Sequence, residues 1–132
     1  RRSSDLAARI GKVEKAYQLF LHATRLDLDD YNNEADQGLH ITSMPGSWLA
    51  IVRGFAGMQV LKETLCFSPV IPQKWDSYSF KVNYLKNTLH IRVGKEIEIS
   101  LTAGSKVDIQ VYGHPYTLER GTELKINMPM CQ

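Results

Sequence analysis

The sequence lacks the features that mark several large classes of protein: long apolar runs, an excess of one charge, and clustered cysteines. Its 132 residues carry 16 basic and 14 acidic side chains, for a net charge of +2, whereas a nucleic-acid-binding protein shows a basic face or stripe. No apolar stretch approaches the roughly 20 residues that a membrane-spanning helix needs, and no secretory signal pattern occurs. We therefore expect a cytoplasmic globular protein that binds neither nucleic acid nor a membrane.

Cysteine and histidine are too sparse to predict a metal site or a disulfide framework. The 2 cysteines, Cys66 and Cys131, have no informative spacing, so a disulfide is possible but a reduced pair is favoured. The 4 histidines stand at positions 22, 40, 90 and 114, without metal-ligand spacing. No nucleophile motif, phosphate-binding glycine loop or dinucleotide fingerprint occurs, so these residues alone give a weak catalytic signal.

The first part of the chain has a helical pattern. A short helix over residues 6–10 is expected to end at Gly11, because glycine readily adopts the left-handed conformation that closes a helix. A second helix is expected over residues 13–24, where apolar and small side chains recur at helical spacing. Together the two helices should form a helical hairpin.

Residues 27–46 show neither helical nor strand periodicity, and Asp, Asn, Gly and Pro dominate them. A loop of that length in a compact domain is usually functional or mobile. Its carboxylates could suggest acid/base pairs, but a solvated acidic loop with turn and capping roles is the favoured interpretation. These carboxylates are Asp27, Asp29, Asp30, Glu34 and Asp36.

A third helix is expected to follow this loop, because Ser43 is a suitable N-cap and Pro45 suits a first helical turn. It should end at Gly57 and is almost wholly apolar, with Arg53 as its one charge. We expect Arg53 to pair with an acidic residue of the loop or of another part of the protein. The face formed by Trp48, Val52 and Phe55 should be buried, and the helix should be enclosed partly by elements that this chain lacks.

After Gly57 the hydrophobic period changes from 3.6 to 2, which predicts β-strands. Alternating segments occur at 78–84, 89–93, 97–101, 107–111, 116–118 and 124–126. Short strands at this spacing are typical of an antiparallel sandwich or barrel. Pro69 and Pro72 make residues 68–75 a connector, and Trp75 is expected to cover the seam between the two halves of the chain.

His40 is the candidate site residue, because it lies just before the third helix, where free backbone N–H groups favour an anion. Thr42 and Ser43 could contribute to such a contact. The alternative is a loop histidine that only bonds a carbonyl group and holds the loop. Residue type alone favours this alternative.

Five segments are distinctive: LAARIG at 6–11, KAY at 15–17, LDLDDYNNE at 26–34, GLHITSM at 38–44 and GFAGM at 54–58. Together they resemble glycoside hydrolase family 65. The resemblance is strong over about residues 6–85. Beyond them it consists only of the alternating apolar and polar pattern of the strands. It implies an α+β fragment in which residues 1–57 are the last helices of a catalytic (α/α)6 barrel. Residues 58–132 would be a C-terminal antiparallel β-sandwich of jelly-roll type.

The resemblance also implies a reaction, the inverting phosphorolysis of a disaccharide. A carboxylic acid would protonate the glycosidic oxygen while inorganic phosphate, the co-substrate, attacks the anomeric carbon from the opposite face. Maltose or a related α-glucoside would give β-glucose 1-phosphate and glucose. No organic cofactor and no metal is implied.

His40 matches the family histidine that contacts phosphate, and the resemblance therefore favours the functional interpretation of this residue. Gly38, Thr42 and Ser43 match neighbours that shape the same loop. The family's general acid lies upstream of Arg1, so no residue here is assigned a catalytic role. The chain alone is therefore expected to be inactive.

Two other interpretations stay open for the sequence. The chain could be a non-catalytic β-sandwich module that binds carbohydrate, or an assembly domain within a homodimer. Because it starts at Arg1 and runs directly into a helical pattern, we expect it to be the C-terminal piece of a longer protein.

Overall fold

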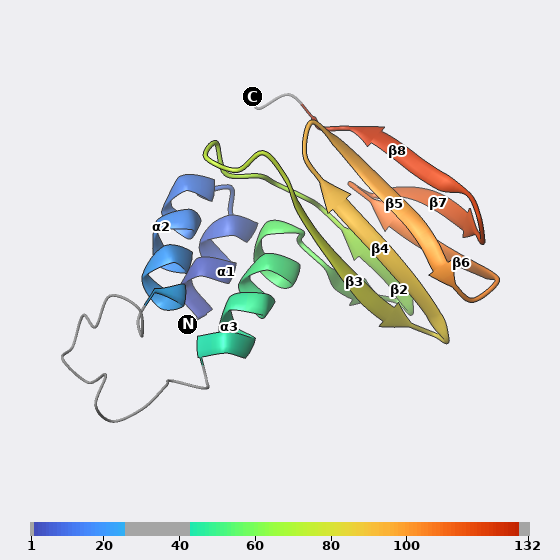
Figure 1. Cartoon of the computed structure of the whole chain (residues 1–132), viewed down its shortest axis with the longest axis horizontal. Coiled ribbons are helices and arrows are strands. Elements are labelled where there is room, and N and C mark those ends of the chain that lie inside the picture. Colours follow the sequence, from blue (N-terminus) through green and yellow to red (C-terminus); the bar gives the residue numbers. More distant parts are fainter. Residues whose placement is uncertain (1, 26–42, 130–132) are drawn as a thin grey trace. The chain divides into compact units, whose positions relative to one another are not determined.

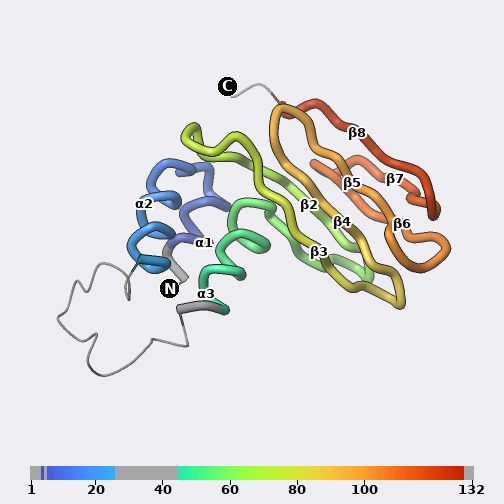
Figure 2. The backbone as a smooth tube through the Cα atoms, in the orientation of Figure 1, coloured from blue at the N-terminus to red at the C-terminus, as the bar shows by residue number. Residues whose placement is uncertain are grey.

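The computed structural model describes residues 2–25 and 43–129, which fall into two compact units, Arg1–Phe55 and Ala56–Gln132. The first unit is helical and the second is built from strands, as Figures 1 and 2 show. This order, helices followed by a mostly antiparallel β-sandwich, is the fold class that the sequence predicts.

The helical unit begins with α1 (Arg2–Arg9) and α2 (Val13–Thr24), which pack against each other. Between them Gly11 has a φ of +79°, and the amide of Lys12 donates to the carbonyl of Ala7 at 2.9 Å. A residue without a Cβ adopts this conformation at little cost. The predicted hairpin of two helices joined at Gly11 is confirmed.

The third helical segment starts as α3 (Ser43–Leu49) and continues as a π-helix, η2 (Ala50–Phe55). The π-helical part was not predicted. Val52 and Phe55 are fully buried, and the Phe55 ring meets the edge of Phe20 of α2, with ring centroids 5.9 Å apart. The second half of the segment therefore has a buried face, whereas Arg53 on it is exposed, and its predicted enclosure by elements that this chain lacks stays a prediction.

Trp48 does not share the buried face, so the prediction that it belongs to the core is wrong for this chain. Its side chain is 48% exposed. A π-helical turn takes one more residue than an α-helical turn, so the positions before it rotate away from the face formed by those after it. The 3.6-residue spacing that grouped Trp48 with Val52 and Phe55 therefore does not hold across residue 50.

The sandwich unit contains two four-stranded sheets, seen as two layers in Figure 1. Sheet A has the order β1 (Gln59–Leu61), β2 (Thr64–Phe67), β6 (Lys106–Val111), β7 (His114–Glu119). Sheet B has the order β3 (Tyr78–Tyr84), β4 (Asn87–Val93), β5 (Glu96–Ala103), β8 (Glu123–Asn127). The predicted alternating strands are confirmed. Sequence analysis missed β1 and the parallel pairing of β2 with β6.

The core of the sandwich comes from the inward rows of both sheets, as the period of 2 predicts. Sheet B contributes Leu89, Ile91, Val93, Ile97 and Ile99, and sheet A contributes Leu65, Phe67, Ile109, Val111 and Leu118, all at most 2% exposed. Tyr78 and Phe80 of β3 are buried too, whereas Val82 and Tyr84, which alternate with them on the same face, are partly exposed.

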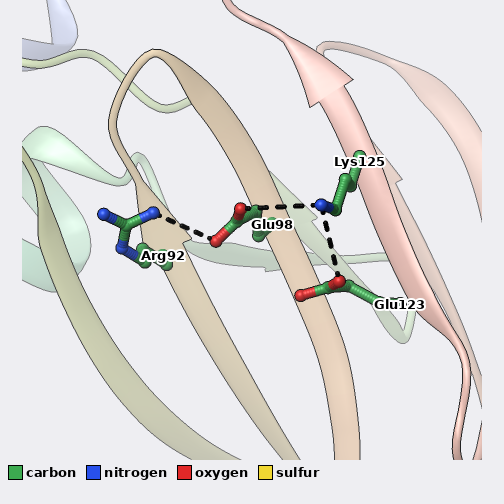
Figure 3. A network of polar contacts seen from close by, with 4 residues as sticks. All are labelled: Arg92, Glu98, Glu123 and Lys125. Atoms are coloured by element: carbon green, nitrogen blue, oxygen red, sulfur yellow. Dashed lines mark hydrogen bonds and ion pairs between the residues drawn. The ribbon is translucent and has the colours of Figure 1, made fainter.

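The outer face of sheet B is polar and carries a chain of ion pairs across three strands (Figure 3). Arg92 of β4 lies 3.2 Å from Glu98 of β5, and Lys125 of β8 lies 4.0 Å from Glu98 and 3.8 Å from Glu123. Arg92, Glu123 and Lys125 are about half exposed and Glu98 is partly exposed, so each pair contributes only about 0–1 kcal/mol. This face is a solvated surface.

The connector between β2 and β3 is held by two tyrosine hydroxyls. Tyr78 donates to the carbonyl of Val70 at 2.9 Å, and Tyr112 donates to the carbonyl of Pro69. The Trp75 ring packs edge-on against Tyr78, with centroids 5.7 Å apart. Burial, and then the neighbouring Tyr112, raises the pKa of Tyr78. Burial also raises the pKa of Tyr112, to about 12.

The raised pKa of Tyr112 predicts a loss of stability in alkali. The folded state favours the neutral phenol of Tyr112. The contribution of this preference to the free energy of unfolding is therefore complete below pH 10 and is lost as the pH rises toward about 12. Thermal unfolding across this range checks it, with Tyr112→Phe as the comparison because the other tyrosines and the lysines titrate in both proteins. The wild-type melting temperature should fall more steeply than that of Tyr112→Phe. Equal slopes would contradict the assignment.

Candidate functional site

The predicted phosphate-binding loop joins two helices that contact each other. It leaves α2 at Thr24, whose hydroxyl donates to the carbonyl of Phe20 at 3.0 Å, and it enters α3 at Ser43. Helices α2, α1 and α3 belong to one unit (Figure 1), and α2 contacts α3. Both described ends of the loop therefore belong to the helical unit.

Most of the predicted site lies outside the described residues. Gly38, His40 and Thr42 belong to that part of the chain, as do the five carboxylates between positions 27 and 36. Ser43 is described as the first residue of α3. The assignment of His40 as the phosphate contact thus stays a prediction.

The start of α3 has the chemistry that such a site requires. The first N–H groups of a helix have no partner within the helix, and an anion can bind them. Pro45 lacks an N–H and fits this first turn without losing a helical hydrogen bond. Burial of Ala50, Val52 and Phe55 fixes the segment that continues from it.

Arg53 is exposed on η2. Arg53 was predicted to pair with an acidic residue of the loop or of another part of the protein. The acidic residues of the loop lie outside the described residues. The pairing therefore stays a prediction, and Arg53 does not form a buried charge within the described unit.

The reactive side chains of the described residues outside this loop include one buried thiol. Cys66 is a free, buried thiol whose Sγ lies 3.4 Å from the carbonyl oxygen of Thr64 and 3.7 Å from Oε1 of Gln110. Cys131, which could form a disulfide with Cys66 or be a second free thiol, lies outside the described residues. Within 2–25 and 43–129, no three His, Cys, Asp or Glu side chains are grouped so that they could hold a metal ion. Nor does this part of the chain contain a helix of the length and apolarity needed to cross a membrane.

Two family models match the chain in succession. Residues 3–49 match the glycosyl hydrolase family 65 central catalytic domain, and residues 58–118 match the glycosyl hydrolase family 65 C-terminal domain. The chain belongs to glycosyl hydrolase family 65. The family-65 match to the catalytic domain covers most of α1, all of α2 and α3 and the loop with His40, and ends before η2. The match to the C-terminal domain covers most of the sandwich.

Three curated relatives of this family-65 chain are named as phosphorylases of different disaccharides. Maltose phosphorylase of Bacillus subtilis is 46% identical over 115 residues, 86% of this chain and 15% of the relative. An α,α-trehalose phosphorylase of Geobacillus stearothermophilus is 39% identical over 124 residues, 93% of this chain and 16% of the relative. A kojibiose phosphorylase of Thermoanaerobacter brockii is 32% identical over 117 residues, 86% of this chain and 15% of the relative.

A solved structure supports the fold over nearly the whole chain. It is a kojibiose phosphorylase from the human microbiome, 36% identical, with a TM-score of 0.86 over 94% of this chain and 16% of that one. The family-65 chain thus spans about one-sixth of the length of the proteins that it matches.

Proposed function

We propose that this chain is the C-terminal part of a disaccharide phosphorylase. In this proposal residues 1–57 are the last helices of a catalytic (α/α)6 barrel, and residues 58–132 are the sandwich domain that follows it. The observation that carries the proposal is the pair of matches in one chain, to the catalytic domain at 3–49 and to the C-terminal domain at 58–118. The phosphorylase names of the curated relatives support it.

The proposed reaction of the whole protein is phosphorolysis with inversion. A carboxylic acid donates its proton to the glycosidic oxygen, and a phosphate oxygen forms the new bond to the anomeric carbon from the opposite face as the old bond breaks. The products of maltose are β-glucose 1-phosphate and glucose. Phosphate is a co-substrate, and the proposal includes neither a metal nor an organic cofactor.

Maltose is the proposed substrate because identity to the maltose phosphorylase is 46%, against 39% and 32% for the trehalose and kojibiose enzymes. A related α-glucoside is the alternative substrate. The homodimer suggested by the family resemblance stays a prediction.

His40 is the proposed phosphate contact in this chain. A ring N–H of His40 would donate to a phosphate oxygen, while backbone N–H groups at the start of α3 complete the contact. Gly38, Thr42 and Ser43 would shape the loop around it. The role of this site is to position phosphate, because the general acid is proposed to lie in another part of the protein.

A segment exchange tests the proposed function. In the B. subtilis maltose phosphorylase the segment aligned with this chain is replaced by the chain itself, and release of β-glucose 1-phosphate from maltose is measured with and without phosphate. We expect phosphate-dependent turnover by the hybrid, and none by the host lacking the segment or by the isolated chain, which lacks the general acid. A folded but inactive hybrid would contradict the proposal, as would turnover by the isolated chain.

A second candidate function is a carbohydrate-binding module within the same chain. The observation that favours it is a pair of hollows on the sandwich unit that share Thr64 and Asp108, away from the predicted phosphate loop in sequence.

A further inference from the structure

The outer face of sheet B has its charges divided between two halves. Strands β3 and β4 contain no acidic residue, and their outward basic side chains are Lys81, His90 and Arg92. Strands β5 and β8 carry the acidic side chains of this face, with one base among them. These are Glu96, Glu98, Glu123 and the base Lys125. The β3–β4 half is therefore basic, and we call Lys81, His90 and Arg92 the basic patch.

Strand register brings the side chains of the basic patch together. Phe80 and Ile91 are buried in the core, so Lys81 and His90, their neighbours along the strands, point outward. The antiparallel pairing sets Lys81 directly opposite His90, and residues paired in this way have Cβ atoms about 4.5–5.5 Å apart. Arg92 lies two residues further along β4 and therefore on the same face. The three basic side chains are thus neighbours on one surface.

Lys81 and His90 lack a counter-charge within the described residues. Arg92 belongs to the row of ion pairs in Figure 3, where its Nη1 lies 3.2 Å from Oε2 of Glu98. Glu98 in turn meets Lys125, so the row contains charges of both signs. Across residues 2–25 and 43–129, neither Lys81 nor His90 forms an ion pair or a side-chain hydrogen bond. Both can bond a ligand without giving up a contact within the protein.

The surroundings of His90 favour an anion beside it. The charged groups that face it are Lys81 of β3, Arg92 of its own strand and Glu98 of β5, of which two are positive and one is negative. A protonated imidazole stands directly opposite an ammonium group here, and like charges paired across strands are destabilising. An anion between them replaces this repulsion with two charge-assisted hydrogen bonds. Ser100 lies opposite His90 on β5 and supplies a neutral hydroxyl donor.

The donors at this place suit a phosphate group better than a carboxylate. Lys81 offers an ammonium group, His90 a ring N–H and Ser100 a hydroxyl. A phosphate monoester has three free acceptor oxygens and a charge of about −1.5 to −2 at pH 7, which matches both cations and the hydroxyl. A carboxylate has two oxygens and a single charge, and it would leave one of the two cations without a counter-charge.

We propose that the basic patch binds a phosphate group, with Lys81 and His90 as its charged contacts and Ser100 as a neutral one. The group belongs either to inorganic phosphate or to a phosphate monoester such as a sugar phosphate. This site is separate from the predicted phosphate contact at His40, and it holds the anion without a reaction. The proposal does not depend on the proposed phosphorolysis, because binding requires neither a disaccharide nor a general acid.

Amide NMR titration of the full 132-residue chain tests the site. Inorganic phosphate and glucose 1-phosphate are added in separate experiments at constant ionic strength, with sodium chloride and glucose as controls. We expect saturable shifts centred on residues 79–81, 90–92 and 98–100 with both phosphates and with neither control. Tighter binding of glucose 1-phosphate would assign the site to a sugar phosphate, and any other order would assign it to inorganic phosphate.

Two pairs of variants provide matched controls, and the amide spectrum of each variant verifies that it is folded. Lys81→Gln should weaken binding by about three- to fivefold, the scale of one contact between exposed charges. Lys106→Gln, which changes an exposed lysine of sheet A, should leave binding unchanged. Sulfate keeps its charge between about pH 6 and 8, so it should bind more tightly at the lower pH, because an imidazole gains charge in this range. His90→Asn should remove this pH dependence, and His114→Asn should keep it.

Several results would overturn the proposal. Absence of saturable shifts on these strands is one, and the same shifts with sodium chloride or glucose are another. Equal effects of the two lysine variants would overturn it too, as would a pH dependence that His90→Asn retains. Shifts in the loop around His40 report the phosphate contact of the proposed function separately, so the failure of one proposal is distinguishable from the failure of the other.

Discussion

Replacing Phe67 with alanine is expected to destabilise the sandwich unit by about 3–5 kcal/mol, the usual range for a large buried aromatic side chain. Phe67 is 1% exposed and ends β2, which lies between β1 and β6 in sheet A. Its removal would leave a cavity that the paired strands cannot easily close. Since whole domains are stable by only about 5–15 kcal/mol, this loss is a large part of the total.

Urea unfolding measures this effect, with Leu85→Ala as the control because Leu85 is 69% exposed in the turn between β3 and β4. The midpoint of Phe67→Ala should fall sharply at an unchanged slope, and that of Leu85→Ala should stay near the wild type. Similar midpoints for both variants would contradict the packing described for β2.

Replacing Gly104 with alanine is expected to cost about 2–5 kcal/mol, because two unfavourable effects combine there. Gly104 has a φ of +101°, a conformation that residues with a Cβ rarely adopt. A Cβ at this position would lie 2.0 Å from Asn87 Oδ1 and 3.0 Å from Asn87 Cα. Asn87 is 8% exposed and its Nδ2 donates to the carbonyl of Leu85 at 2.9 Å, so it cannot simply move aside.

Gly113→Ala separates the two effects. Gly113 also has a positive φ, +79°, but a Cβ there would have nothing within 4 Å. We expect the free energy of unfolding of Gly113→Ala to fall by about 1 kcal/mol, from backbone strain alone. The difference between the melting temperatures of the two variants reports the clash with Asn87. Equal melting temperatures would show that this clash is relieved without cost.

The fold was largely predictable because periodicity survives wherever one face of an element is buried. The strands at 78–84 and 107–111 alternate in sequence as they do in exposure. Strand β1 was missed because its burial does not alternate: Gln59, Val60 and Leu61 are all exposed. The parallel pairing of β2 with β6 joins segments about 40 residues apart, and no local pattern encodes such a partner.

The π-helical part of the third segment was missed for a related reason. An apolar run with helical spacing indicates a helix but does not specify one extra residue in a turn. The burial of Val52 and Phe55 was predicted correctly, whereas the exposure of Trp48 depends on that extra residue.

The candidate sites differ in what the sequence could show. His40 lies in a continuous segment with a family resemblance, so the sequence alone brought it forward. The pairing of the pocket-lining residues Thr64 and Asp108 was not predictable in this way, because their strands are about 40 residues apart and meet only through the parallel pairing of β2 with β6. Short-range motifs cannot identify such a cluster.

We propose that this chain supplies the phosphate contact of a phosphorylase. The KM for phosphate of the hybrid maltose phosphorylase tests this role of His40 most directly. His40→Ala should raise that KM by roughly 10- to 100-fold, the loss expected for one hydrogen bond to a charged group. The KM for maltose should change little, and His114→Ala, an exposed histidine at the start of β7, should leave both values unchanged. An unchanged KM for phosphate in His40→Ala would contradict the claim.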